Sequence, residues 1–159
     1  TVKFIFQPGE ETLLGAKEMI AAGVLEDPEV DTIVALHAWP PYPTGVLGTW
    51  KGVYHASADV FSAKIIGGSG HASSPYKTND ALVATAHAVV ALQSITSRQV
   101  NNLENTVLSV CTLHGGDTFN VLPESVKFTG TVRTHCAEIR SSMPAKMERI
   151  ISNVAHAFG

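Results

Sequence analysis

The sequence predicts an α/β segment over residues 1–52, followed by an α+β unit over residues 53–159. Two observations support this prediction. In the first segment, two nearly all-apolar stretches flank a helical pattern, as in β-α-β units whose strands are covered on both faces. In the second, strand and helix patterns follow one another in the order β-α-β-β-α, which is one strand short of the ferredoxin-like motif β-α-β-β-α-β.

The first segment is predicted to hold a strand at 2–6, a helix at 12–22 and a second strand at 32–37. Gly23 follows the helical pattern directly, in the position where glycine commonly ends a helix. Three prolines between residues 40 and 43 then interrupt regular structure. Strand, helix and strand in this order are typical of one repeat of an α/β domain.

The second unit is predicted to hold strands at 56–66, 106–113 and 125–134, with helices at 81–98 and 137–158. Asn79 or Asp80 is positioned to cap the first of these helices. The apolar residues that recur at helical spacing along this helix are Leu82, Val83, Ala86, Val89, Val90 and Ile95.

Composition is that of a globular chain. Of its 159 residues, 45% are apolar and 16% are charged, enough to form a sizeable core. The net charge of −3 gives no argument for binding nucleic acid or an anionic membrane. No apolar run reaches the ~20 residues of a membrane helix. Two cysteines are no disulfide framework. We expect a buried strand thiol at Cys111, a partly exposed one at Cys136, and a cytoplasmic location.

Candidate chemistry begins at two predicted strand ends. Glu10 and Glu11 follow the first apolar stretch, and His37 ends the second. One carboxylate could bind a metal while its neighbour moves a proton, and the imidazole could be another ligand, which together suggest half of a metal site. The alternative is that the two acids simply open a helix, where carboxylates are favoured by the positive end of the helix dipole.

Seven short motifs extend this picture along nearly the whole chain. In order, they are Phe6–Glu11 (FQPGEE), Gly15-Ala16-Lys17, Leu36–Pro40 (LHAWP), Gly70-His71-Ala72 with Pro75, His114-Gly115-Gly116, Phe119–Pro123 (FNVLP) and Gly130–Thr134 (GTVRT). Together they resemble the metal-dependent amidohydrolases that include N-acyl-amino-acid amidohydrolases, hippurate hydrolases and plant auxin-conjugate hydrolases.

The resemblance implies an architecture. Residues 1–52 would be part of a zinc-peptidase-like α/β catalytic domain, and residues 53–159 a ferredoxin-like lid and dimerisation domain whose last strand is missing. The upstream Cys-x-His-Asp stretch and the histidine near the C-terminus that the family uses are absent. We therefore expect an internal fragment of a longer enzyme. That parent would be a homodimer joined through the lid.

The resemblance also implies the role of each residue at the metal centre. Glu10 matches the general base, and Glu11 and His37 match metal ligands. The intact site would hold two divalent ions, with zinc, manganese, cobalt and nickel left as open choices. Two ligands are too few for a closed protein site, so the fragment is expected to bind metal weakly.

Three lid residues complete the expected site. His71 matches a histidine that reaches the active site of the partner subunit, where it donates to the oxyanion. Asn120 matches a residue that shapes the substrate site, and Arg133 matches one that holds a substrate carboxylate. The simpler alternatives are a loop histidine, a turn asparagine, and an arginine in a surface ion pair with Glu124 or Glu138.

The expected activity is metal-dependent hydrolysis of the amide bond of N-acyl amino acids or small peptide-like conjugates by the parent enzyme. The alternative is a catalytically inactive dimerisation or binding fragment with an incomplete metal site. Metal content and turnover distinguish the two.

Overall fold

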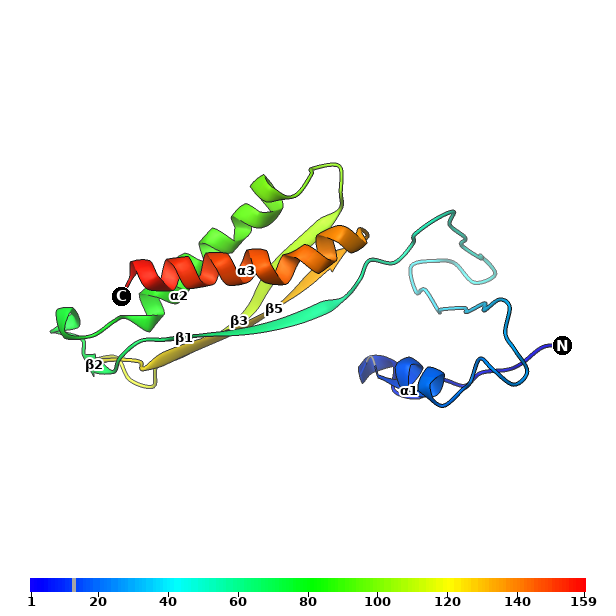
Figure 1. Ribbon diagram of the computed structural model, residues 1–159, viewed down its shortest axis with the longest axis horizontal. Coiled ribbons are helices and arrows are strands. Elements are labelled where there is room, and N and C mark those ends of the chain that lie inside the picture. The colour runs from blue at the N-terminus through cyan, green and yellow to red at the C-terminus, as the bar shows by residue number, and fades with distance from the viewer. Residues whose placement is uncertain (13) are drawn as a thin grey trace. The chain divides into compact units, whose positions relative to one another are not determined.

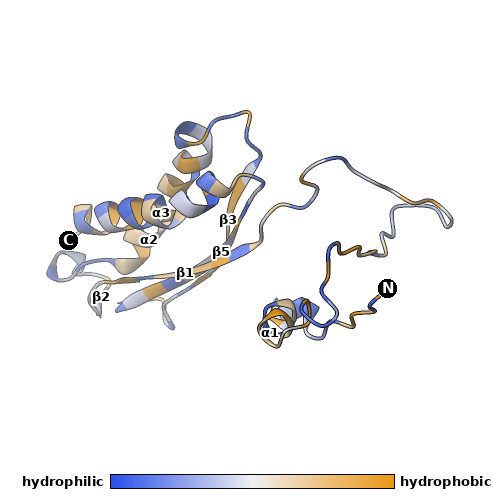
Figure 2. Ribbon diagram, turned by 45° about the vertical axis from the view of Figure 1, so that its right-hand side comes forward, coloured by the Kyte–Doolittle hydropathy of each residue, from blue (hydrophilic) through white to orange (hydrophobic). Residues whose placement is uncertain are grey.

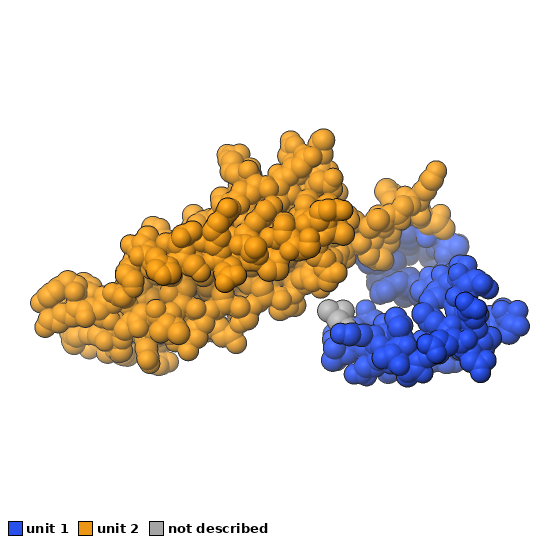
Figure 3. All heavy atoms as spheres, in the orientation of Figure 1, with its two compact units in different colours: residues 1–48 blue, residues 49–159 orange. Residues whose placement is uncertain are grey.

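The computed structural model describes residues 1–12 and 14–159 (Figure 1). It separates into two compact units, residues 1–48 and residues 49–159, which are described one at a time (Figure 3). No described helix is both long and apolar enough to cross a membrane. The elements are η1 (Glu10–Thr12), α1 (Gly15–Ala21), β1 (Asp59–Ile66), β2 (Gly70–His71), η2 (Pro75–Lys77), α2 (Ala81–Ser94), η3 (Ile95–Gln99), β3 (Thr106–His114), β4 (Val121–Leu122), β5 (Ser125–Thr134) and α3 (Ala137–Ala157).

The first unit contains one regular helix, α1, within the predicted range 12–22. It ends at Ala21 with Ala22 as the C-cap, and Gly23 follows with a φ of 79°, the left-handed conformation that glycine adopts without strain. Leu13, which also falls in the predicted helix, lies outside the described residues. Local helical periodicity and a terminating glycine were therefore sufficient to place this element.

The two strands predicted at 2–6 and 32–37 are wrong for this chain, because neither stretch is assigned as a strand in the structure. A strand requires a hydrogen-bonded neighbour, and no described residue supplies one. The apolar side chains are consequently uncovered: Phe6 is 86% exposed and Leu36 is 83% exposed. Figure 2 shows hydrophobic colouring along this extended N-terminal stretch. The apolar pattern of these two stretches indicates side chains suited to burial, but the described residues leave these side chains exposed.

The second unit is built on an antiparallel three-stranded sheet with the order β1-β5-β3, so β5 is the central strand. Gly130 lies midway along it, opposite Phe61 on β1 and Val110 on β3. A Cβ on this glycine would overlap the carbonyl oxygen of Ser109 and lie 2.6 Å from the Phe61 ring. Close approach between the strands therefore requires glycine at this position.

Helices α2 and α3 cover one face of the sheet (Figure 1). Helix α2 begins where predicted, because the Asp80 carboxylate accepts hydrogen bonds from the backbone N–H groups of Leu82 (2.9 Å) and Val83 (3.0 Å). The buried core joins these helices to the inner face of the sheet; it comprises Ile65, Ala81, Ala84, Ala88, Leu92, Ile95, Leu108, Val126, Phe128, Val132, Met143 and Met147.

The apolar residues that recur at helical spacing over 81–98 are mostly not the ones that pack into the core. Only Ile95 belongs to the buried core, while Leu82, Val83 and Val90 are exposed. The helix is apolar nearly all round, so periodicity did not distinguish its faces. The face that packs inward is instead rich in alanine, which lets the helix approach its neighbours closely.

Cys111 is exposed, which contradicts the expectation of a buried strand thiol. The pairing of β3 with β5 shifts register between Val110 and Thr112, so Cys111 has no paired residue opposite it. This irregularity breaks the inside–outside alternation on which the expectation rested. Cys136 is partly exposed, as predicted, and both thiols are free.

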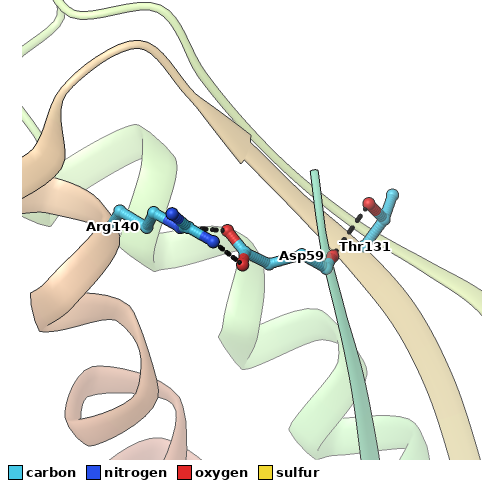
Figure 4. Close-up of polar contacts among 3 residues, drawn as sticks. All are labelled: Asp59, Thr131 and Arg140. Carbon is cyan, nitrogen blue, oxygen red and sulfur yellow. Dashed lines mark hydrogen bonds and ion pairs between the residues drawn. The ribbon is translucent and has the colours of Figure 1, made fainter. Parts of the chain in front are cut away.

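The outer edge of β1 has no partner among the described strands. Between this edge and α3 lies a groove of about 820 Å³, whose apolar walls include Phe61, Met143 and Met147. At one end, Arg140 of α3 donates to both carboxylate oxygens of Asp59, at 2.8 and 2.7 Å (Figure 4). This guanidinium lowers the pKa of Asp59, chiefly through the hydrogen bonds. The pair ties α3 to the strand where the groove begins.

Candidate functional site

Glu10 and Glu11 open the 3₁₀ turn η1, and both are exposed. Consecutive residues of a 3₁₀ turn point about 120° apart. The two carboxylates are therefore free to act on different groups, as a base and a ligand would have to. The same position also fits the simpler reading, in which acids open a helical turn.

His37 is exposed, and only one of its ring nitrogens makes a hydrogen bond to a described residue. Its Nδ1 lies 2.6 Å from the carbonyl oxygen of Ala38. A carbonyl can only accept, so Nδ1 carries the proton in this contact and Nε2 presents its lone pair. Histidine ligands of metals commonly donate their other N–H to a backbone carbonyl in this way. The ring is therefore in a tautomer suited to binding a metal through Nε2.

The described residues do not assemble a metal site on their own. Within residues 1–12 and 14–159, no three His, Cys, Asp or Glu side chains are gathered closely enough to hold a metal ion. Glu11 and His37 have donor atoms of the right type, but a closed protein site for zinc takes four ligands. The ligand set is thus incomplete within the part of the chain that the structure describes.

His71 lies on a small hairpin formed by β2 and β4, where it pairs with Val121. Its Nδ1 is 2.8 Å from the hydroxyl oxygen of Ser73 and 3.2 Å from the backbone nitrogen of Ser73. The backbone N–H of Ser74 closes the turn by donating to the His71 carbonyl at 2.9 Å. The ring is therefore anchored through one nitrogen and keeps Nε2 open.

Asn120 joins the same hairpin. Its carbonyl accepts from the N–H of Ala72 at 3.0 Å, and the Thr118 hydroxyl donates to its side-chain oxygen at 3.2 Å. With the oxygen engaged in this way, the amide NH₂ remains available as a donor. Thr118 and Val121 also line a hollow of about 790 Å³, within the size range of small-molecule pockets. The structure thus brings two of the predicted lid residues together beside a cavity.

Arg133 is exposed near the other end of β5, opposite Val107. It lies eight residue steps along the strand from Ser125, where β5 leaves the hairpin region, a span of roughly 26 Å at about 3.3 Å per step. It forms no ion pair with a described residue, so the predicted alternative of a bond to Glu124 or Glu138 is not observed. Within one chain, Arg133 is therefore remote from His71.

Two contacts of the site were not predicted from sequence, namely those of Ser73 and Thr118. Each hydroxyl lies two residues from the side chain it contacts. Serine and threonine in turns often bond groups two residues away, which is the one local signal that could have identified them.

Comparison with known proteins defines the class to which this fold and hairpin belong. The family model described as the M20 "Peptidase dimerisation domain" matches residues 54–158. The chain therefore belongs to the M20 peptidase dimerisation domain family.

Curated relatives extend over the first unit as well. The chain is 41% identical over 159 residues to an N-acyl-L-amino acid amidohydrolase of Geobacillus stearothermophilus, covering 99% of this chain and 42% of that protein. It is 38% identical over 159 residues to an N-acetylcysteine deacetylase of Bacillus subtilis, covering 100% of this chain and 41% of the relative. The chain thus spans about two fifths of the length of these relatives. The predicted resemblance to amidohydrolases is confirmed.

Among solved structures, a dinuclear metal-binding peptidase of the M20 family from Bacillus subtilis superimposes with a TM-score of 0.74. It is 31% identical, and the match covers 98% of this chain and 37% of that structure. The mixed α/β fold expected from the sequence, as part of a catalytic and lid arrangement, is that of its structural relatives.

Proposed function

We propose that the enzyme containing this chain hydrolyses the amide bond of N-acyl amino acids or related small conjugates. The observation that carries the proposal is the hairpin that presents His71 and Asn120 side by side, each with a nitrogen available at its tip. Two such donors suit the oxyanion that forms when water adds to an amide carbonyl. The relatives named for N-acyl amino acid and N-acetylcysteine hydrolysis support this substrate class.

We assign residues 1–52 to a catalytic domain and residues 53–159 to the lid. Glu11 and His37 would contribute to binding two divalent metals, a number supported by the dinuclear relative. When bound, such metals supply Lewis-acid activation of water and carbonyl groups. Glu10 would take the proton from the attacking water and return it to the leaving nitrogen. The free thiols fit the expected cytoplasmic setting.

A test of the base uses Glu10→Gln in the full-length enzyme. This substitution removes the proton acceptor and leaves Glu11 and His37 unchanged, so metal content should stay the same. Turnover of an acyl-amino acid should fall by about 10²- to 10⁴-fold, the usual contribution of a general base. Turnover close to the parental rate would show that the role is assigned to the wrong residue.

The lid is proposed to form a homodimer in which each active site draws on both chains. A small N-acyl amino acid is on the order of 10 Å long, much shorter than the ~26 Å that separates Arg133 from the hairpin end of β5. This separation supports an arrangement in which His71 and Arg133 of one lid serve different active sites. In a dimer, one chain would supply Arg133, and the partner chain would supply His71 and Asn120.

Mixing inactive full-length variants tests this arrangement. Glu10→Gln mixed with His71→Ala places both lesions in one site of a mixed dimer and leaves the other site intact. Activity should return, up to about a quarter of the parental value after random subunit exchange. Glu10→Gln mixed with Arg133→Ala is the matched control. If Glu10 and Arg133 act in a site from the same chain, each site of the mixed dimer carries one of the two lesions, and activity should not return. Subunit exchange is verified by a label. Recovery of activity in the control but not in the first mixture would mean that Arg133, and not His71, acts from the partner chain.

A further inference from the structure

The contact between Ser73 and His71 has a direction that the two distances determine together. The hydroxyl oxygen of Ser73 is 2.8 Å from His71 Nδ1 and could either donate or accept. The backbone nitrogen of the same serine is 3.2 Å from the same Nδ1. A backbone N–H can only donate, so Nδ1 has to offer its lone pair.

The alternative protonation state conflicts with this geometry. A proton on Nδ1 would point toward the N–H of Ser73, and two hydrogens would then face each other. With Nδ1 as the acceptor, the Ser73 hydroxyl also donates to it, so two donors share one lone pair. A neutral imidazole carries a single ring proton, which therefore resides on Nε2.

We propose that Ser73 is a positioning residue that holds His71 in its Nε2–H tautomer. On the proposed function, this histidine then meets the substrate as a neutral hydrogen-bond donor, which stabilises an oxyanion without transferring its proton. This tautomer is the opposite of that of His37, whose Nδ1 donates to a carbonyl and whose Nε2 is left as an acceptor. The two histidines are therefore prepared by their neighbours for different tasks.

The turn around Ser73 is held by main-chain hydrogen bonds that do not involve the Ser73 hydroxyl. The Ser74 N–H donates to the His71 carbonyl, and the Ala72 N–H donates to the carbonyl of Asn120, the residue before β4. Both bonds involve only the main chain, so replacing the Ser73 hydroxyl leaves them in place. Ser73 is also exposed, so its removal creates no cavity in the core. A change in the imidazole can thus be separated from a change in the fold.

The experiment measures the tautomer by ¹⁵N NMR of the histidine rings in the 159-residue chain, at about pH 8, where a free imidazole is neutral. The His71→Ala variant identifies the His71 signals among those of the seven histidines. Ser73→Ala removes the hydroxyl and Ser73→Thr retains one. Ser74→Ala is the matched control, because the Ser74 hydroxyl, at the N-cap of η2, makes no capping hydrogen bond to a described residue. Backbone amide spectra check that the hairpin is intact in each variant.

We expect an unprotonated Nδ1 and a protonated Nε2 in the parent chain, in Ser73→Thr and in Ser74→Ala. In Ser73→Ala the ratio of the Nε2–H to the Nδ1–H form should fall about fivefold, the effect of losing one ordinary hydrogen bond. A proton on Nδ1 of the parent chain, or an unchanged ratio in Ser73→Ala, would overturn the inference. The readout requires no turnover, so a failure of the proposed hydrolase activity would not be mistaken for a failure of this assignment.

Discussion

Two leucines of helix α2 should respond very differently to the same substitution. Leu92 is fully buried, with 0% exposure, whereas Leu82, on the same helix, is 42% exposed. Leu→Ala removes three carbons, worth about 2.4 kcal/mol if all are buried, at about 0.8 kcal/mol each. At position 92 the enclosed cavity adds to this cost, so we expect about 2.7–5 kcal/mol of lost unfolding free energy.

Leu82→Ala is the matched control, with the same chemistry on the same helix. In proportion to the buried fraction of Leu82, this substitution should lower the unfolding free energy by at most about 1.4 kcal/mol. Solvent can occupy the vacated space, so no enclosed cavity adds to the cost. Leu92→Met keeps the volume of the side chain and should cost less than about 1.5 kcal/mol. This variant keeps the comparison informative if Leu92→Ala does not fold.

Urea unfolding followed by far-UV circular dichroism measures these differences. Tryptophan fluorescence is a poorer probe, because both tryptophans, Trp39 and Trp50, are exposed and lie outside the three-stranded sheet. With m of about 2 kcal/mol per M, Leu92→Ala should lower the midpoint by about 1.4–2.5 M and Leu82→Ala by no more than about 0.7 M. Equal shifts for the two alanine variants, or a larger shift for Leu82→Ala, would refute the assignment of the inward face of α2.

Three further predictions concern the sheet and the metals. Gly130→Ala should lower the unfolding free energy by about 1–3 kcal/mol or more in urea titrations, because the new methyl overlaps the Ser109 carbonyl; a neutral effect would mean that the strands are further apart. Arg140 lowers the Asp59 pKa below its ordinary value of 3.8, so this pair stabilises the fold above about pH 4 and its contribution is lost as the pH falls through the lowered pKa. Urea midpoints of Asp59→Asn and the parent should thus differ at pH 7, and the difference should shrink as the pH is lowered through the acidic range; a constant difference would count against the pair. Isothermal titration of the 159-residue chain with Zn²⁺ or Mn²⁺ should show at most weak binding, and tight stoichiometric uptake would contradict the incomplete ligand set.

The strands of the second unit could be predicted because their pattern and their pairing partners lie in the same stretch of sequence. The range 125–134 coincides with β5, which is alternately buried along most of its length. The ranges 2–6 and 32–37 have an equally clear apolar pattern, yet they form no strands here. Apolar pattern reports a tendency to be buried, whereas a strand also needs a neighbour to share its hydrogen bonds.

The candidate site shows a similar division. The motifs around His71, Asn120 and Arg133 indicated these residues as candidates for the site, and their roles stay predictions. The distances among them could not be predicted, because they depend on the pairing of β2 with β4 and on the length of β5. The contacts of the Ser73 and Thr118 hydroxyls are local, each with a side chain two residues away, but the sequence does not specify which nearby group a turn serine or threonine contacts.

The central position of β5 also determines the order in which the second unit can fold on the ribosome. β1 is made first, but its only partner among the described strands begins at Ser125, about sixty residues later in synthesis. At about 5–20 residues per second, β1 waits for several seconds with both edges bare. Helix α2 can form in that interval, since its contacts are local, but the sheet cannot begin until β5 emerges and pairs with β3 and β1 together. A chain interrupted before β5 would leave every long strand of this unit without a partner, and would be a natural substrate for chaperones.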